Sequence, residues 1–499
     1  MEILDPDACY RALTTRDPRF DGRFFVGVIS TGIYCRPVCP ARTPKFEHCR
    51  FFPTAASAQE AGFRPCLRCR PETAPDTGAW RGTSNTVSRG LALIAEGALD
   101  GEDGTVEALA ARLGVGERQL RRLFVQHLGA SPIAVAQTRR VLFAKQLVHE
   151  TRLPMTEVAL AAGFGSLRRF NETFRSLFGR PPGALRRKTA AAMAAGSVAA
   201  TGVTVRLRYR PPYDWPAMLA FLETRAIAGV ERVAGGRYSR TVLDDGDIGT
   251  VEIGHEAGRN SLAATIRFPR VEALARIVAR IRRVFDLGAD VAAIGAHLAQ
   301  DPLLAPLVQE RPGLRAPGGW DGFELAVRAV LGQQVSVESA RNLAGRLADL
   351  CGARLAAEGT LRLAFPTPRQ VVVADLSALG MPGGRRAALK ALAEASLADP
   401  HLFRPLGTVE ETVARLRTIK GVGEWTAQYI ALRAVRETDA FPASDIGLLR
   451  GAASSDGVRP SAAELRGRAE PWRPWRGYAA QHLWAADAAR PIARGTMHE

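Results

Sequence analysis

The sequence predicts a multidomain α+β protein: a small cysteine-rich α/β domain, an all-α domain, a small β-sheet-containing domain and a second all-α domain. The first observation behind this prediction is the length of 499 residues, which usual domain sizes divide into about three or four units. The second is that six of the seven cysteines fall within the first 69 residues. The third is the apolar pattern, which changes along the chain from helical spacing to strand alternation and back.

The domain boundaries follow from composition and periodicity. Loop-rich sequence with strand-like runs such as FFVGVIST gives way to helical spacing, and strand-like runs such as VTVRLRYRPP precede a long helical segment. Two stretches of turn-forming or small residues, 71–85 and 189–202, are predicted to be linkers, with an Ala-rich helix as the alternative for the second. We therefore predict four domains, at residues 1–78, 86–187, 203–310 and 311–499.

The composition favours a polyanionic partner. Lys and Arg together number 67 against 50 Asp and Glu, which gives a formal net charge of +17. A positive field attracts nucleic acid because each cation that meets a phosphate releases a condensed counterion. The alternative is a bias of composition, since most of the positive charge is Arg and the chain is also rich in Ala and Gly. Charge alone therefore leaves nucleic-acid binding open.

The chain carries no sequence signal for a membrane or for secretion. It has no run of about 18 apolar residues, and its acidic start, MEILDPDACYRALTTRD, does not lead into an apolar stretch. The gathering of the cysteines in one segment favours reduced thiols around a metal over disulfides. We expect a cytoplasmic protein with no membrane partner.

The cysteine cluster contains two chelating pairs. Cys35 and Cys39 are separated by three residues, and Cys66 and Cys69 by two. Four thiolates at such spacings can close a tetrahedral zinc site, so we expect one Zn²⁺ held by all four sulfurs. A purely structural site is one interpretation. The other is a nucleophilic thiolate, because zinc keeps sulfur deprotonated at neutral pH.

A family resemblance favours the second interpretation. The segments GIYCRPVCPAR and GFRPCLRCRPE, within residues 8–72, resemble the N-terminal domain of Ada-type adaptive-response regulators. Such domains irreversibly accept a methyl group from a DNA methylphosphotriester. The resemblance implies a small zinc-bound α/β domain with Cys35 as the methyl acceptor. It also implies zinc ligation by Cys35, Cys39, Cys66 and Cys69, and phosphate contacts by Thr31, Arg42 and Arg64.

The same segment departs from the family at one position and leaves two cysteines unassigned. A basic phosphate contact of the family falls on Pro40, which cannot serve. Cys9 and Cys49 match neither chelating pair, and we expect buried thiols there.

Residues 86–187 contain two helix-turn-helix patterns. In the first, Thr105 caps a helix with a buried stripe, Gly114 supplies a turn, and a second helix carries several Arg residues. The second pattern comprises MTEVALAAGF, a turn at Gly165 and Ser166, and LRRFNETFRSLFGRPP. A plain helical bundle is the alternative for one such unit. The pair resembles the AraC-type DNA-binding domain, which implies an all-α double helix-turn-helix domain that binds promoter DNA.

The C-terminal part carries a hairpin motif followed by an acidic residue. In LRTIKGVGEWTAQYIALRAV (416–435), Gly421 and Gly423 permit a tight turn between two helices, and its amides can face a DNA phosphate. A lone Gly-x-Gly would more simply be a helix–helix turn. Here DAFPASDIGLLR follows and places Asp445 twenty residues after Trp425. This layout resembles the helix-hairpin-helix DNA glycosylase superfamily.

A narrower resemblance points to the 3-methyladenine DNA glycosylase II family. It rests on GLRAPGGWDGFELAVRAVLGQQVSVESA, the hairpin and WRPWRGYAAQHLWAAD (472–487). It implies an all-α glycosylase domain with Asp445 as the catalytic carboxylate. The remaining implied contacts are a base pocket of Trp425, Tyr429 and Trp484 and a groove-probing Gln333.

The chain departs from this family at two positions that bear on substrate range. Gln334 stands at the apolar wedge position, and Ala485 replaces a pocket tyrosine. Two other tryptophans, Trp472 and Trp475, are predicted to be core residues rather than pocket residues.

The predicted chemistry is hydrolysis of an N-glycosidic bond. Alkylation at N3 or N7 makes a purine cationic, and an aromatic pocket can stack the flipped base with about 0.5–2 kcal/mol for each cation–π contact. Bifunctional members of the superfamily carry a lysine that attacks the sugar, two residues after the second hairpin glycine. This chain has Trp425 at that position, and Lys420 lies before the hairpin and does not match it. With only Cys351 beyond residue 69, a four-cysteine iron–sulfur cluster cannot form there. We expect a monofunctional enzyme that leaves an abasic site.

Three functions fit these observations. The first is a methyl-activated transcriptional activator joined to an active glycosylase. Its expected partners are alkylated double-stranded DNA, promoter DNA and RNA polymerase, and its expected location is the bacterial nucleoid. The second is a DNA-binding regulator whose C-terminal half has lost its activity. The presence of Asp445 and the three pocket aromatic residues argues against this second function. The third is a zinc-stabilised repair enzyme with no transcriptional role. The sequence has no Pro-Cys-His-Arg tetrapeptide, so we do not expect direct repair of O6-methylguanine.

Overall fold

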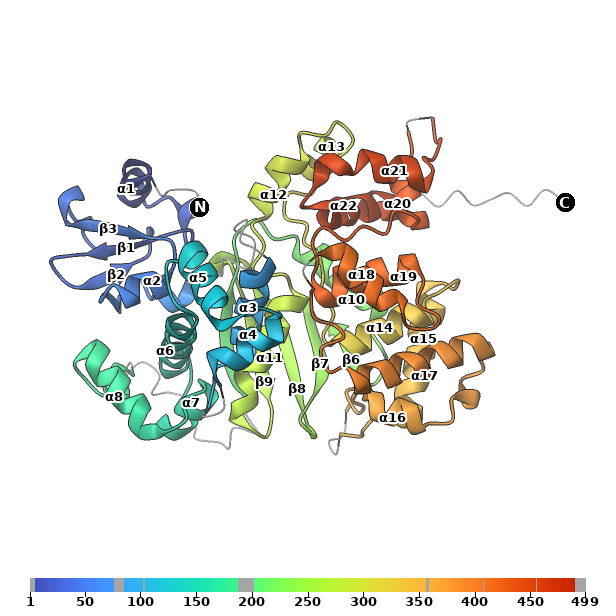
Figure 1. Cartoon of the computed structure of the whole chain (residues 1–499), viewed down its shortest axis with the longest axis horizontal. Helices are drawn as coiled ribbons and strands as arrows, with labels where there is room; N and C mark the ends of the chain where they lie inside the picture. Colours follow the sequence, from blue (N-terminus) through green and yellow to red (C-terminus); the bar gives the residue numbers. More distant parts are fainter. Residues whose placement is uncertain are drawn as a thin grey trace.

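The computed structural model describes residues 5–75, 85–101, 104–186, 202–355, 359–406, 408–454 and 456–489 (Figure 1). The N-terminal α/β domain lies at one end, helices from residues 337–398 lie at the other, and a β-sheet stands between them. Most of the two predicted linkers, residues 76–84 and 189–201, lies outside the described residues. None of the described helices is both long and apolar enough to cross a bilayer.

The N-terminal domain is a four-stranded sheet with two helices. Its strand order is β3-β1-β2-β4, and only the β2–β4 pair is parallel. Asp5 caps the first helix by accepting from the backbone N–H groups of Asp7 and Ala8. Edge-to-face and tilted aromatic pairs around Tyr34 and Phe63 fill the core. The elements are α1 (Pro6–Thr15), β1 (Phe25–Val28), β2 (Ile33–Cys35), β3 (Cys49–Phe52), α2 (Ala55–Glu60) and β4 (Arg64–Pro65).

The helical domain contains both expected helix-turn-helix units. Thr105 accepts a hydrogen bond from the Ala108 N–H, and Gly114 ends the helix at φ +70°, so the predicted cap and turn are confirmed. Ser166 caps the last helix in the same way. One 19-residue helix, α6, joins the two units. The elements are α3 (Asn85–Ala95), α4 (Val106–Leu113), α5 (Glu117–Leu128), α6 (Pro132–Glu150), α7 (Met155–Ala161) and α8 (Leu167–Phe178).

The sheet domain is a five-stranded antiparallel sheet with order β5-β9-β8-β7-β6. Alternate residues of β5 are buried, as the apolar–basic alternation predicts. Helix α11 packs its apolar face on the core, and its partly buried Arg276 and Arg280 donate to Asp244 at the end of β7. The elements are β5 (Val203–Arg208), α10 (Trp215–Arg225), β6 (Glu231–Ala234), β7 (Arg237–Asp244), β8 (Asp247–Glu256), β9 (Ser261–Arg267) and α11 (Leu274–Val284).

The C-terminal domain is all-α and has two hydrophobic cores, and Trp484 packs against both. Trp472 is 1% exposed and donates to Asp301 at 2.8 Å, which confirms it as a core residue, and Trp475 packs against the same core. The helices are α12 (Val291–Leu298), α13 (Ala305–Glu310), α14 (Gly322–Leu331), α15 (Val337–Cys351), α16 (Pro368–Val373), α17 (Gly383–Ala398), α18 (Val409–Arg417), α19 (Glu424–Ile430), the π-helix η9 (Ala431–Val435), α20 (Ile446–Gly451), α21 (Ala462–Arg468) and α22 (Arg476–Ala489).

The helical domain is joined closely to both of its neighbours. Side chains of α6, α7 and α8 share one core with the strands of the sheet domain. On the other side, the buried Lys145 ammonium of α6 donates to the Cys66 carbonyl at 2.9 Å and to Glu72 at 2.7 Å. Glu72 lies in a 3-10 turn at Pro71–Thr73, so the start of the predicted linker belongs to the N-terminal domain. The helical domain is therefore in direct contact with both neighbouring domains and is not separated from them by linkers in the way that the sequence predicts.

The ionic contacts continue from Glu72 to the sheet domain. Arg70 donates to Glu72 at 3.1 Å and to Glu150 at 3.2 Å. Glu150 in turn accepts from the Arg206 backbone N–H of β5 at 2.9 Å. A chain of polar contacts thus runs from a loop cysteine through α6 to the first strand of the sheet domain.

Replacing Lys145 by Met should destabilise the N-terminal half of the protein. The side chains of Lys145 and Glu72 are 0% and 1% exposed, so the substitution leaves a carboxylate buried without its ammonium partner. Loss of one partner of a buried pair typically costs about 3 kcal/mol or more. We expect a lower denaturation midpoint, measured by resistance of residues 5–75 to proteolysis in denaturant. The double variant Lys145→Met, Glu72→Gln should recover part of the loss, and an equal loss in both variants would contradict the ion-pair explanation.

Candidate zinc centre and base-binding site

The four predicted zinc ligands come together in space. The sulfur atoms of Cys35, Cys39, Cys66 and Cys69 all lie within 4.8 Å of one another. Strand pairing is responsible, because the Cys66 N–H donates to the Tyr34 carbonyl at 3.0 Å and so brings the second pair beside the end of β2. Four thiol sulfurs at this separation are the donor set that a tetrahedral zinc ion takes.

Backbone N–H groups point at two of the sulfurs. The Arg36 N–H donates to Cys69 Sγ at 3.4 Å, and the Arg68 N–H donates to Cys66 Sγ at 3.3 Å. Such donors stabilise negative charge on sulfur. Three of the ligands are buried, whereas Cys35 is only partly buried. Of the four residues, the one predicted to accept the methyl group is therefore the most exposed as a whole, although all four sulfurs face one another inside the cluster.

The predicted phosphate contacts lie on the same domain. Thr31 is exposed in the turn between β1 and β2, and Arg42 is exposed beyond the Cys39 turn. Arg64 is half-buried in β4, opposite Ile33 of β2. Among the described residues, neither arginine side chain forms an ion pair, so both guanidinium groups are available to an anion.

The two unassigned cysteines differ from each other. Cys9 is buried, as predicted, and burial raises the pKa of its thiol to about 11. Cys49 is only half-buried and donates to the Lys45 carbonyl at 3.3 Å, so the prediction of a fully buried thiol is wrong there. The reason is that Cys49 begins β3, at the edge of the sheet.

In the C-terminal domain, the carboxylate of Asp445 accepts hydrogen bonds from the indole N–H groups of two tryptophans. It caps α20, and its Oδ1 accepts from the Leu448 N–H at 3.1 Å and from Trp484 Nε1 at 2.8 Å. Its other oxygen, Oδ2, accepts from Trp425 Nε1 at 2.7 Å. Three N–H donors from three helices therefore fix the orientation of one partly exposed carboxylate.

The three predicted pocket aromatics are grouped around this carboxylate. Trp425 and Tyr429 stack with ring centroids 5.4 Å apart and planes 14° apart, and Tyr429 meets Trp484 edge-on at 6.3 Å. All three rings are partly exposed, in contrast to the core residue Trp472. Gly447 allows the close approach, because a Cβ there would lie 3.0 Å from Trp484 Cδ1 and 3.1 Å from Asp445 Oδ1.

The hairpin glycines have different roles. Gly421 has a φ of +87°, and a Cβ there would lie 2.4 Å from the Ala388 Cβ of α17, so both conformation and space require glycine. Gly423 has a φ of −83° and open space at its Cβ position, and it serves as the cap residue of α19. Both are exposed, as a phosphate contact requires.

Gln333, the predicted groove-probing residue, forms hydrogen bonds within the protein, whereas its neighbour Gln334 is exposed. The Gln333 amide donates to the Gly421 carbonyl at 2.9 Å and to Thr426 Oγ1 at 3.0 Å, so it fastens its loop to the hairpin. Gln334, at the wedge position, is exposed with a φ of +56°. Of the two side chains, Gln334 is therefore the more exposed, and the groove-probing role of Gln333 stays a prediction.

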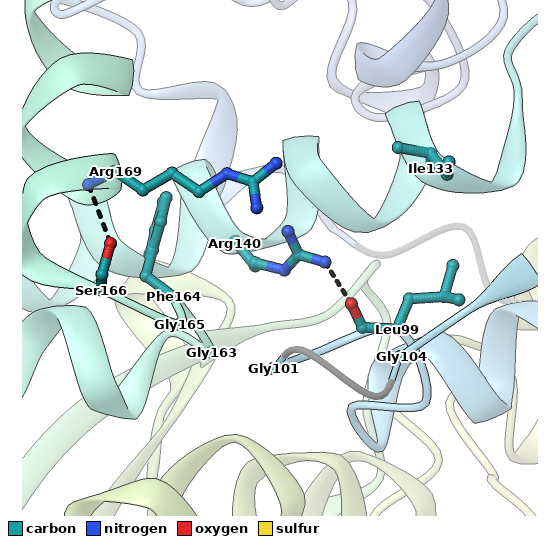
Figure 2. A pocket seen from close by; sticks show the side chains of 10 residues that line it. All are labelled: Leu99, Gly101, Gly104, Ile133, Arg140, Gly163, Phe164, Gly165, Ser166 and Arg169. Atoms are coloured by element: carbon teal, nitrogen blue, oxygen red, sulfur yellow. Dashed lines mark hydrogen bonds between the residues drawn. The ribbon is translucent and has the colours of Figure 1, made fainter.

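A separate cavity of about 430 Å³ lies between the two helix-turn-helix units (Figure 2). Arg140 and Arg169 extend into it from α6 and α8. Arg140 is engaged within the protein, since it donates to Asp100 at 2.9 Å and to the Leu99 carbonyl. The cavity contains none of the predicted site residues.

The geometry defines the class of protein. A four-cysteine zinc centre and two helix-turn-helix units precede a sheet domain and a helix-hairpin-helix domain whose carboxylate lies among aromatic rings, as in a DNA glycosylase. Family profiles agree: the metal binding domain of Ada matches residues 8–72, a helix-turn-helix domain matches 109–188, and the AlkA N-terminal domain matches 204–321.

Similar proteins identify the family. A probable bifunctional transcriptional activator/DNA repair enzyme AlkA of Mycobacterium tuberculosis is 41% identical over 482 residues, 96% of each chain. DNA-3-methyladenine glycosylase 2 of Escherichia coli is 38% identical over 57% of this chain and 98% of its own. A solved 3-methyladenine DNA glycosylase from Archaeoglobus fulgidus shares the fold, with a TM-score of 0.51 and 20% identity over 57% of this chain and 98% of that chain.

The chain belongs to the family of bifunctional transcriptional activator/DNA repair enzymes. It combines an Ada-type methyl-accepting zinc domain and a DNA-binding activator region with a DNA-3-methyladenine glycosylase. Its zinc site is the one formed by the four cysteines.

Removal of zinc should unfold the N-terminal domain, because the binding free energy of a structural zinc is folding free energy. We expect Cys39→Ser to lose the metal and to make residues 8–72 sensitive to protease, while base excision persists. Cys49→Ser is the matched control and should keep one zinc per chain. Metal analysis and limited proteolysis measure both effects, and a Cys39→Ser protein that retained its zinc would exclude Cys39 as a ligand.

Proposed function

We propose that Cys35 and Asp445 carry the two chemical activities of this chain. The observation that carries the proposal is the position of each group: Cys35 is the partly exposed residue of the four-cysteine cluster, and Asp445 is a partly exposed carboxylate among three aromatic rings. The corresponding domains are residues 1–78, 86–187, 203–310 and 311–499.

The first activity is methyl acceptance. Zinc bound to the cluster would keep the sulfurs deprotonated at neutral pH. The Cys35 sulfur attacks the methyl carbon of a DNA methylphosphotriester, the carbon–oxygen bond breaks, and the electron pair leaves on the phosphate oxygen as a diester anion. Thr31, Arg42 and Arg64 bind the flanking phosphates. The thioether product has no route back, which makes the reaction irreversible.

Methylation also acts as the signal for transcription. It removes one negative charge from a surface that must approach phosphates, which weakens electrostatic repulsion by DNA. The two helix-turn-helix units then bind promoter DNA through α5 and α8, whose outward faces are exposed and carry several arginines. RNA polymerase is the partner that activation requires, and association with the nucleoid follows from DNA binding.

The second activity is hydrolysis of the bond between sugar and alkylated purine. The flipped base stacks among Trp425, Tyr429 and Trp484 and leaves with the electron pair of the glycosidic bond. The Asp445 carboxylate stabilises the cationic sugar, water adds its oxygen to the anomeric carbon, and one proton is released. Trp425 occupies the position where a lyase would need an amine, so the strand stays intact.

Exposure to DNA that contains methylphosphotriesters should add one methyl group to Cys35. Peptide mass spectrometry of the full-length protein measures the site and the stoichiometry. Cys35→Ser should accept no methyl group and should still excise bases, since the two sites lie on separate domains. A methyl group on Cys39, Cys66 or Cys69 instead would exclude Cys35 as the acceptor.

Asp445→Asn should abolish release of 3-methyladenine and leave methylation of Cys35 unchanged. The substitution keeps the size of the side chain but removes its charge. Loss of a preorganised electrostatic group typically lowers a rate about 100- to 1,000-fold. Base release is measured on alkylated duplex, and strand breaks should appear only after heat or alkali. Normal excision by the variant would overturn the assignment of Asp445, and a borohydride-trapped adduct would overturn the monofunctional mechanism.

A further inference from the structure

A buried arginine lies directly behind the proposed base pocket. Arg433 belongs to η9, the π-helix that continues α19, and it is only 2% exposed. Its guanidinium carbon lies 5.0 Å from the ring centroid of Trp484 and 5.8 Å from that of Tyr429. Phe221 of the sheet domain covers another side at 4.9 Å. A guanidinium therefore contacts two of the three rings proposed to stack the base.

This guanidinium is held only by neutral groups. It donates to the Pro317 carbonyl at 3.0 Å and to Gln481 Oε1 at 2.7 Å. In the described part of the chain, no carboxylate lies within ion-pair distance of Arg433. Burial lowers its pKa to about 10, so it remains charged at neutral pH. The back of the pocket thus carries a positive charge that no ion pair neutralises.

We propose that Arg433 determines how the base pocket discriminates between cationic and neutral modified purines. The proposal rests on the glycosylase activity proposed above. Trp484 is partly exposed, and a base stacked on it opposite the guanidinium would lie about 8–9 Å from that charge, across an indole ring that screens a charge less than water does. A cationic purine is repelled over this distance, whereas a neutral purine is not. The charge therefore lowers the preference of the pocket for cationic over neutral modified purines.

Arg433 also positions Trp484. Gln481 precedes Trp484 by three residues on α22, so the two side chains share one face of that helix. The bond from Arg433 to Gln481 fastens this face to η9, the continuation of the helix α19 that carries Trp425 and Tyr429. Loss of positioning should lower excision of all bases alike, whereas loss of charge should change their ratio. The two effects can therefore be measured separately.

Three variants separate charge from structure. Gln481→Glu keeps the arginine and its packing and places a carboxylate against the guanidinium. Arg433→Met removes the charge at similar length, and Arg433→Lys retains a charge. Gln481→Glu also keeps the inference testable if Arg433→Met does not fold.

The experiment measures single-turnover excision of 7-methylguanine, which is cationic, and of hypoxanthine, which is neutral, from otherwise identical duplexes. We expect Gln481→Glu and Arg433→Met to raise the ratio of the 7-methylguanine rate to the hypoxanthine rate about three- to tenfold. Arg433→Lys should leave this ratio within about twofold of the parent protein. A parallel fall of both rates, with an unchanged ratio, would overturn the inference and leave the glycosylase activity standing. If the parent protein released neither 7-methylguanine nor hypoxanthine, the result would instead contradict the proposed glycosylase activity.

Discussion

The contact between Lys145 and Glu72 determines how this chain is assembled. An ammonium buried to this degree is stable only with a partner, and here it has two, the Glu72 carboxylate and the carbonyl of the zinc ligand Cys66. It binds the helical domain to the loop that carries the second cysteine pair. On the same helix, the Gln146 amide donates to the Arg206 carbonyl of β5 and the Glu150 carboxylate accepts from the Arg206 N–H, so one helix connects the zinc centre with the sheet domain. The cluster and the sheet domain are therefore connected by buried contacts and not by a linker alone.

The DNA-binding and repair parts of the chain are joined by a shared hydrophobic core as well as by the covalent chain. The second helix-turn-helix unit and the sheet domain share a core, so neither can move independently without exposing apolar surface. Helices α5 and α8, which we propose contact promoter DNA, nevertheless keep their polar faces exposed. DNA binding and base excision are thus built on adjoining parts of one body, while their reactive groups remain on separate domains.

The sequence predicted the elements that depend on local spacing and missed those that depend on long-range packing. Cysteine pairs three or four positions apart chelate one ion whatever surrounds them, and the helix caps at Thr105 and Ser166 are local hydrogen bonds. By contrast, the Pro- and Thr-rich composition around Glu72 predicted a linker, because Lys145 lies 73 positions away. The hydrogen bonds from both indoles to Asp445 could not be derived either, since Trp484 comes from a helix 39 positions later. No pattern marked Arg433, whose position behind the rings depends on the packing of three segments.

Both candidate sites contain N–H groups that point at anionic side chains. At the zinc centre, the backbone N–H groups of Arg36 and Arg68 point at the sulfurs of Cys69 and Cys66, two ligands that neighbour the proposed acceptor Cys35. In the glycosylase domain, two indole N–H groups and a helix-terminal N–H point at the Asp445 carboxylate. Rigid N–H donors orient an anion without supplying a full positive charge, so the Asp445 carboxylate keeps the capacity to stabilise a cation that its proposed role requires. Arg433 differs in being a full charge, and it lies behind the rings rather than against the carboxylate. In the proposed mechanism this placement lets Arg433 act on the charge of the base and leaves the Asp445 carboxylate free to act on the sugar.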